Sequence, residues 1–231
     1  GRCRMLQKPT LSIRRKRSLL SRHEIDGFAP AKALPRQHMT DALETLLHRS
    51  AELHRALDDQ LSRARFDDSI HTDLTLVPAR LALEHGSGIA ILVESGRLSS
   101  AGVLLRAQLE ATIRAAWLLY VASDEWIEKY LEKARDNPHR DPGSTPAVDE
   151  MIKAIERKAA EGLAPSALAP QLRVLKEGAW HSLNSFVHSG LHPTLLQFSG
   201  YSAEAADAAL RNANSLSVVA AMLIALLSGD E

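Results

Sequence analysis

Three charged side chains recur at helical spacing inside an otherwise apolar stretch, residues 99–120. Arg106, Glu110 and Arg114 are each four residues from the next. Since an α-helix turns through about 100° per residue, the three side chains fall within about 80° of one another on one face. Apolar residues cover most of the remaining surface, which is typical of a helix buried on all sides. A buried charge is costly unless it is paired, so these side chains must meet partners or line a cavity.

Two histidines on a later predicted helix, residues 171–188, could complete this polar stripe. His181 and His188 are seven residues apart, which is two helical turns, and therefore share a side of that helix. One interpretation is a structural network in which carboxylate and imidazole groups satisfy the arginines. The other is a site in which an arginine holds an anion and a histidine moves a proton. Both use the same candidate residues, which are Arg106, Glu110, Arg114, His181 and His188.

The elements that would position these residues are all helical. Aromatic residues are scarce at 4%, Ala and Leu are abundant, and no segment has the pattern of a strand. We expect an all-α fold, a single bundle of six or seven helices around a buried central helix at about 99–120. A loop should separate the last two helices. The predicted helices are 40–64, 78–95, 99–120, a fourth from 124, 147–161, 171–188 and 204–227.

Local signals predict several helix ends. Thr40 and Ser123 are suited to N-cap positions, and Gly96 is suited to the position just past a helix C-terminus. Pro78 fits the first turn of the second helix, because a first-turn residue needs no backbone N–H donor. Gly86, inside that helix, would let a neighbouring helix approach closely.

Residues 1–38 differ from the rest of the sequence. The first 36 residues hold ten Lys or Arg against two acidic residues, whereas the remainder holds 18 basic and 26 acidic residues. We expect a disordered basic arm over 1–38 and a helical domain over 39–231. The arm is either a tether for nucleic acid or a membrane surface, or an unstructured tail. The acidic remainder argues against a nucleic-acid surface spread over the fold.

Other features of the sequence limit the function classes. Cys3 is the single cysteine, so no intrachain disulfide can form, and we expect a cytoplasmic protein. No apolar run of about 18 residues suggests a membrane span, and the apolar run 216–227 should lie in the core or in a homodimer interface. His188 and His192 have a metal-ligand spacing, but Gly190 interrupts the helix between them. With no phosphate-binding loop, Cys pair or HExxH motif, we expect neither cofactor nor metal.

Two separated motifs carry a resemblance to a known family. The first has the pattern RxxxExxxRxxW and ends at Trp117, and the second, NxxxHxG, runs from Asn184 to Gly190. Over about residues 40–228 the chain resembles a family of uncharacterised bacterial helical proteins, and more distantly the HEPN-type domains, many of which are metal-independent ribonucleases of toxin and phage-defence systems. The resemblance implies an uncharacterised helical protein with a role in defence.

Two alternatives from other functional classes remain open. One is a HEPN-like ribonuclease in which Arg106 or Arg114 binds phosphate and His188 is the general acid/base. HEPN ribonucleases have four to six residues between an arginine and the histidine on one helix, and the chain departs from this, because seven residues lie between Arg173 and His181. The other alternative is a module that binds a small molecule or anion at the same arginines. The partners would then be RNA or a small anion.

Overall fold

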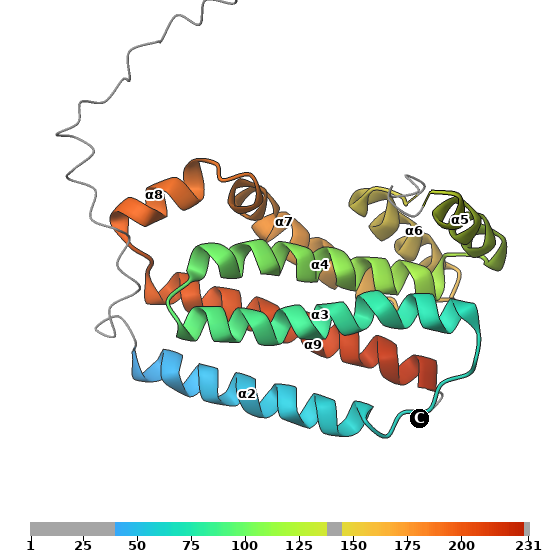
Figure 1. Cartoon of the computed structure of the whole chain (residues 1–231), viewed down its shortest axis with the longest axis horizontal. Helices are drawn as coiled ribbons and strands as arrows, with labels where there is room; N and C mark the ends of the chain where they lie inside the picture. The colour runs from blue at the N-terminus through green and yellow to red at the C-terminus, as the bar shows by residue number, and fades with distance from the viewer. Residues whose placement is uncertain (1–39, 138–144, 229–231) are drawn as a thin grey trace, which may run out of the picture. The chain divides into compact units, whose positions relative to one another are not determined.

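The computed structural model describes residues 40–137 and 145–228 of the chain. The predicted disordered arm, residues 1–38, lies outside these residues. Within them the fold is all-helical, as expected, and has no strand (Figure 1). The described residues form eight helices, so the expected number of six or seven was wrong. The helices are α2 (Asp41–Leu61), α3 (Ile70–Glu94), α4 (Leu98–Tyr120), α5 (Asp124–Asp136), α6 (Val148–Ala160), α7 (Leu168–Val187), α8 (Leu191–Ser199) and α9 (Ala203–Ser228).

The predicted helix caps are confirmed. The side chain of Thr40 accepts a hydrogen bond from the backbone N–H three residues later, and Ser123 does the same at the start of α5, each at 3.2 Å. Gly96 follows α3 with a φ of 68°, a left-handed conformation that glycine adopts without strain. The N–H of Arg97 then bonds back to Leu92 at 2.7 Å. Only Gly96 and Arg97 lie between Ser95, the C-cap residue of α3, and Leu98, the first residue of α4. The two helices therefore form a tight pair.

Two predicted boundaries were wrong, both at prolines. Helix α3 begins at Ile70 with Ser69 as its N-cap, eight residues before the predicted start at Pro78. Pro78 lies inside the helix and is buried; burial of Pro78 with its neighbours Leu76 and Ala79 offsets the hydrogen bond that proline removes. The expected loop after α7 is instead helix α8. Its Pro193 sits in the first turn, where the backbone N–H has no partner within the helix in any case.

Helix α4, which carries the predicted charged stripe, packs against α3, α6, α7 and α9. Twelve of its 23 residues are buried, against three in α2. Helices α2, α3, α4 and α9 run side by side, with α2 along the outer edge of this group (Figure 1). Helix α2 packs more extensively against α9 than against α3. The looser α2–α3 packing leaves the groove described below.

Gly86 is the point at which α3 approaches its neighbours most closely, as its position in the sequence predicted. A Cβ atom at Gly86 would lie 2.3 Å from Ser217 Oγ on α9 and 2.8 Å from Gln108 Nε2 on α4. It would also lie 3.0 Å from Cε1 of His54 on α2. Three helices therefore converge on a position that no larger residue can occupy without displacing them.

Two helices satisfy the length and composition expected of a membrane span, which the sequence analysis did not anticipate. They are α3 and α9, whose most apolar 18-residue windows have mean hydropathies of 1.3 and 1.5. Buried residues make up 39% and 44% of these windows. Core helices of soluble proteins pass the same test, so the observation is weak evidence for a membrane.

We predict that Gly86→Ala destabilises the protein by about 1–3 kcal/mol, because the added methyl overpacks the contact with Ser217. The matched control is Gly178→Ala in α7, where nothing lies within 4 Å of the new Cβ. That change should stabilise the helix by about 0.5–1 kcal/mol. Urea denaturation of both variants measures the difference, and equal effects would contradict the close contact at Gly86.

Candidate functional site

The structure brings Arg106 and Glu110 together on a helix face that packs against Trp180 of α7. Arg106 Nη2 lies 2.7 Å from Glu110 Oε1, with side-chain exposures of 14% and 39%. The guanidinium carbon of Arg106 lies 3.1 Å from the centroid of the Trp180 ring. Burial lowers the pKa of Arg106, and the neighbouring Glu110 opposes that shift. This pair is a half-buried ion pair stacked on an aromatic face.

Further charged pairs join α7 to α6 beside Trp180. Lys176 Nζ lies 5.2 Å from the Trp180 centroid and 2.5 Å from Asp149 Oδ1. One turn earlier on α7, Arg173 Nη2 lies 2.6 Å from Glu156 Oε1. Each of these cations, Arg106 included, is therefore paired with a carboxylate. One atom of Arg106, Nη1, is buried and has no hydrogen-bond partner among the described residues. The arrangement is that of a structural contact between α4, α6 and α7.

The other residues of the predicted stripe lie apart from this pair in their contacts. Arg114 lines a different cavity, of about 200 Å³, next to Trp117 and Trp126. His181 and His188 are both exposed on α7, and His188 is its C-cap residue. In the described part of the chain, no hydrogen bond or ion pair connects either histidine with Arg106, Glu110 or Arg114. A shared network or site of all five residues stays a prediction.

We predict that Arg106→Met lowers the free energy of unfolding by about 1–3 kcal/mol, because it removes the ion pair with Glu110 and the contact with Trp180. The matched control is Arg211→Met, which breaks an ion pair of the same i,i+4 spacing on exposed α9 surface. The control should cost less than about 1 kcal/mol. Chemical denaturation compares the two, and a cost for Arg106→Met no larger than the control would argue against a structural role.

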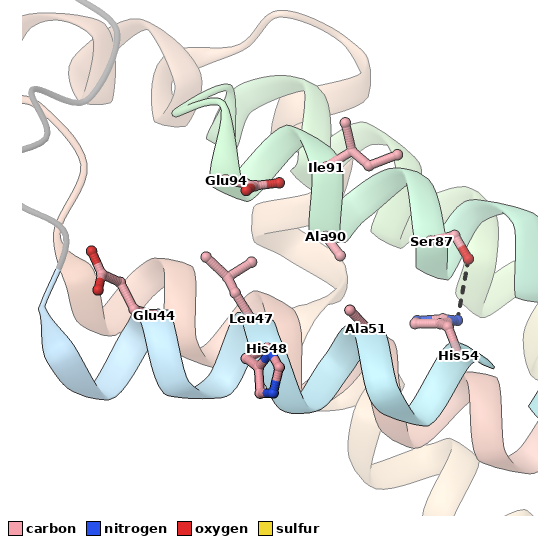
Figure 2. A pocket seen from close by; sticks show the side chains of 9 residues that line it. All are labelled: Glu44, Leu47, His48, Ala51, His54, Ser87, Ala90, Ile91 and Glu94. Carbon is pink, nitrogen blue, oxygen red and sulfur yellow. Dashed lines mark hydrogen bonds between the residues drawn. The ribbon is translucent and has the colours of Figure 1, made fainter. Parts of the chain in front are cut away.

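A cavity larger than the one beside Arg114 lies elsewhere, between α2 and α3. It is a groove of about 780 Å³ whose floor and walls are formed by α2 and α3 alone (Figure 2). Its walls are mainly apolar, with carboxylates at one end and a histidine–serine pair at the other (Figure 2). The residues that line it are Glu44, Leu47, His48, Ala51, His54, Ser87, Ala90, Ile91 and Glu94.

His54 lies between this groove and the buried contact of α3 with α4 and α9. It is only 9% exposed, and its Nδ1 lies 3.2 Å from Ser87 Oγ. Its Nε2 is buried with no hydrogen-bond partner in the described part of the chain. Burial lowers the pKa of His54 below its ordinary 6.5, and Asp58 opposes the shift. The ring is therefore neutral at pH 7, with one N–H and one lone pair.

Behind His54, polar side chains from α4 and α9 form a buried polar cluster. Gln108 Nε2 donates to the carbonyl of Ala213 at 3.0 Å and to Ser217 Oγ at 3.1 Å. Asn214 Nδ2 donates to Ser50 Oγ at 2.8 Å, which links α9 to α2. The side-chain carbonyl oxygens of Gln108 and Asn214 have no partner among the described residues. Buried polar groups of this kind hold helices in one register, and each unsatisfied atom is costly.

The geometry favours binding over covalent catalysis. Ser87 and His54 are spaced like a nucleophile and its base. Acyl transfer also needs N–H donors aimed at the developing oxyanion. Ser87 lies in the middle of α3, where the neighbouring backbone N–H groups are used within the helix. The described part of the chain also has no group of three His, Cys, Asp or Glu side chains that could hold a metal ion.

We predict that the protein loses stability as the pH falls below about 6.5, because the unfolded chain binds a proton at His54 that the folded chain resists. The stability from this group is fully present above pH 6.5 and is lost between that value and the lower pKa of the folded state. Urea denaturation from pH 8 to pH 5 measures it. His54→Gln should flatten this dependence, whereas His181→Gln, at an exposed position, should preserve it.

An NMR titration of the wild-type protein tests the same prediction without a variant. The His54 ring signals should change with a midpoint below 6.5. A midpoint at or above 6.5 would contradict burial of the neutral ring.

Sequence reasoning missed His54, Ser87 and Gln108, although a signal for them was present. His54 falls on the apolar stripe of α2, seven residues after Leu47, and Gln108 lies between Leu105 and Leu109 on the apolar part of α4. A polar residue at such a position has to be satisfied inside the fold. The predicted site was instead composed of charged residues on α4 and histidines at the α7 end of the chain.

The chain belongs to a family of unknown function, DUF6988, whose model matches residues 79–231. This supports the predicted membership of an uncharacterised family. The match does not test the two motifs, the HEPN-like relationship or the bacterial origin. Neither a curated protein nor a solved structure matches the chain. The family match covers α4 to α9 and most of α3, and it begins after α2.

Proposed function

We propose that the protein binds a small organic molecule in the groove between α2 and α3. The observation that carries the proposal is the groove itself, about 780 Å³, with a neutral, buried histidine at one end. Ligand sites in proteins are typically cavities of about 300–1,000 Å³ with apolar walls and a few convergent polar groups. Helical bundles commonly place such sites between helices.

The walls of the groove suit an apolar ligand body. Leu47 and Ala51 on α2 face Ala90 on α3, and Ile91 also lines the groove (Figure 2). Ile91 is 62% exposed, so its side chain offers apolar surface that binding would remove from water. Burial of such surface is worth about 25 cal/mol per Å², before the cost of immobilising the ligand is subtracted.

The proposed site differs from the one predicted at the charged stripe. Binding of RNA or an anion by Arg106, Arg114, His181 and His188, with a defence role, stays a prediction. Arg106 is stacked on Trp180 and paired with Glu110, which favours a structural role for this pair over exposure to a ligand.

We predict that 1,6-hexanediol, a neutral six-carbon probe, binds in the groove with millimolar affinity. In a ¹H–¹⁵N NMR titration, the amide signals that shift should belong to the lining residues of α2 and α3. Ala51→Phe should abolish these shifts, because its ring fills the groove from an exposed position. Ala56→Phe is the matched control, since Ala56 is exposed on the same helix outside the groove.

Saturable shifts that survive in Ala51→Phe would place the binding elsewhere. The absence of shifts in the lining residues of the wild-type protein would contradict the proposed function.

A further inference from the structure

A second cavity, lined in part by aromatic rings, lies between α3, α4 and α5. Its volume is about 200 Å³, and Trp117 of α4 lines it together with Trp126 and Tyr130 of α5. The two tryptophan rings meet edge to face with their centroids 4.7 Å apart, and Tyr130 stacks on Trp126 at 5.0 Å. These ring contacts restrict one another, so the cavity offers a preorganised aromatic surface to a ligand.

The side of this cavity that α3 forms is apolar and open to solvent. Leu74 and Pro78 line its inner part, and Val77 and Leu81 line it with 57% and 41% of their surface exposed. Because the last two side chains are in contact with water, a ligand can enter the cavity beside them. Its binding would also remove their apolar surface from water, which is favourable.

The cavity holds one cation, whose charge no other group compensates. Arg114 is the single charged residue among the described residues that line it. In the described part of the chain, the guanidinium of Arg114 has no ion pair, hydrogen bond or ring contact. Glu110, one turn earlier on α4, is instead bonded to Arg106 at 2.7 Å. A half-buried guanidinium without a carboxylate favours an anionic ligand, since its lost hydration is not replaced.

The guanidinium of Arg114 is accessible to such a ligand. Arg114 is partly exposed, and none of its unpaired nitrogens is fully buried, whereas Nη1 of Arg106 is. Arginine remains protonated at neutral pH, and its planar fork of N–H donors matches the two oxygens of a carboxylate. The carboxylate is therefore the anion that this position recognises best.

The volume of the cavity limits the rest of the ligand to about one ring. An apolar cavity of about 150 Å³ in a protein is known to hold a benzene molecule. The 200 Å³ present here has room for one such ring and a short arm that carries the carboxylate.

We propose that this cavity binds a small aromatic carboxylate. The ring lies against Trp117, Trp126 and Tyr130, and the carboxylate bonds to the guanidinium of Arg114. The inference goes beyond the proposed function, because the cavity shares no lining residue with the groove between α2 and α3. Either site can therefore fail its test without the other.

The test uses three probes of similar size that differ in the charge of one end, which are phenylacetate, phenylacetamide and phenethylamine. Each is titrated into the full chain at pH 7.5 and followed by the indole N–H signals in NMR spectra. Trp117 and Trp126 line the cavity, whereas Trp180 lies against Arg106 and is an internal control.

We expect phenylacetate to shift the signals of Trp117 and Trp126 but not that of Trp180. It should bind about tenfold more tightly than phenylacetamide, and phenethylamine should bind most weakly. Acetate, which lacks the ring, should bind at least about tenfold more weakly than phenylacetate.

Substitution of the arginine tests its role directly. Arg114→Gln should lose about tenfold in affinity for phenylacetate and keep its affinity for phenylacetamide, which also shows that the cavity is intact. The matched control is Arg157→Gln, which removes the same charge from an exposed position on α6. The control should bind all the probes as the wild-type protein does.

Three results would overturn the inference. They are equal affinities of the wild-type protein for phenylacetate and phenylacetamide, undiminished binding of phenylacetate by Arg114→Gln, and no shift of the Trp117 and Trp126 signals with any probe. The first and third use the wild-type protein alone, so they decide the matter even if Arg114→Gln does not fold. The groove between α2 and α3 is tested separately by its own titration with 1,6-hexanediol.

Discussion

The close approach of helices at Gly86 is the constraint on which the rest of the structure depends. The absence of a side chain at this position lets α3 pack against Ser217 of α9 and Gln108 of α4, with His54 of α2 at the edge of the same contact. Close packing there also determines where the polar groups meet, because Gln108, Ser217 and His54 all converge on one point of α3. The arrangement of the buried polar cluster therefore follows from a backbone contact.

Two kinds of buried polar group occur in the molecule, and their surroundings differ. Arg106 keeps its charge by pairing with Glu110 and by lying against Trp180. His54 has no ion-pair partner, and burial keeps it neutral. Because Arg106 is paired and stacked inside a contact between helices, it contributes mainly to structure. The groove lined by His54 has a larger volume than the cavity lined by Arg114, and for this reason the groove, and not the charged stripe, is the better candidate for a binding site.

Much of the secondary structure could be predicted from the sequence, because it depends on local chemistry. The caps at Thr40 and Ser123 and the turn at Gly96 follow from side-chain and backbone preferences within a few residues. Pro78 and Pro193 misled the prediction, since proline is unfavourable in a helix only where an N–H is needed or where packing does not compensate.

The groove could not be predicted, because it depends on how closely two helices pack. The periodicity of α2 shows that Ser50 and His54 face inward, but nothing in it shows that α2 packs more closely on α9 than on α3. The charged residues at 106, 110 and 114 were correctly placed on one predicted helix. Sequence spacing does not show which neighbour each of them meets: Arg106 lies against Trp180, whereas Arg114 lines a cavity next to Trp117 and Trp126.

The boundary of the family match has a consequence for how the groove could diverge. The matched segment begins at residue 79, so it contains Ser87, Ala90, Ile91 and Glu94 but none of α2. One wall of the groove thus lies within the matched segment, and the opposite wall lies before it. Substitutions in the part of α2 that lines the groove would change its surface without altering the sequence that the family model matches.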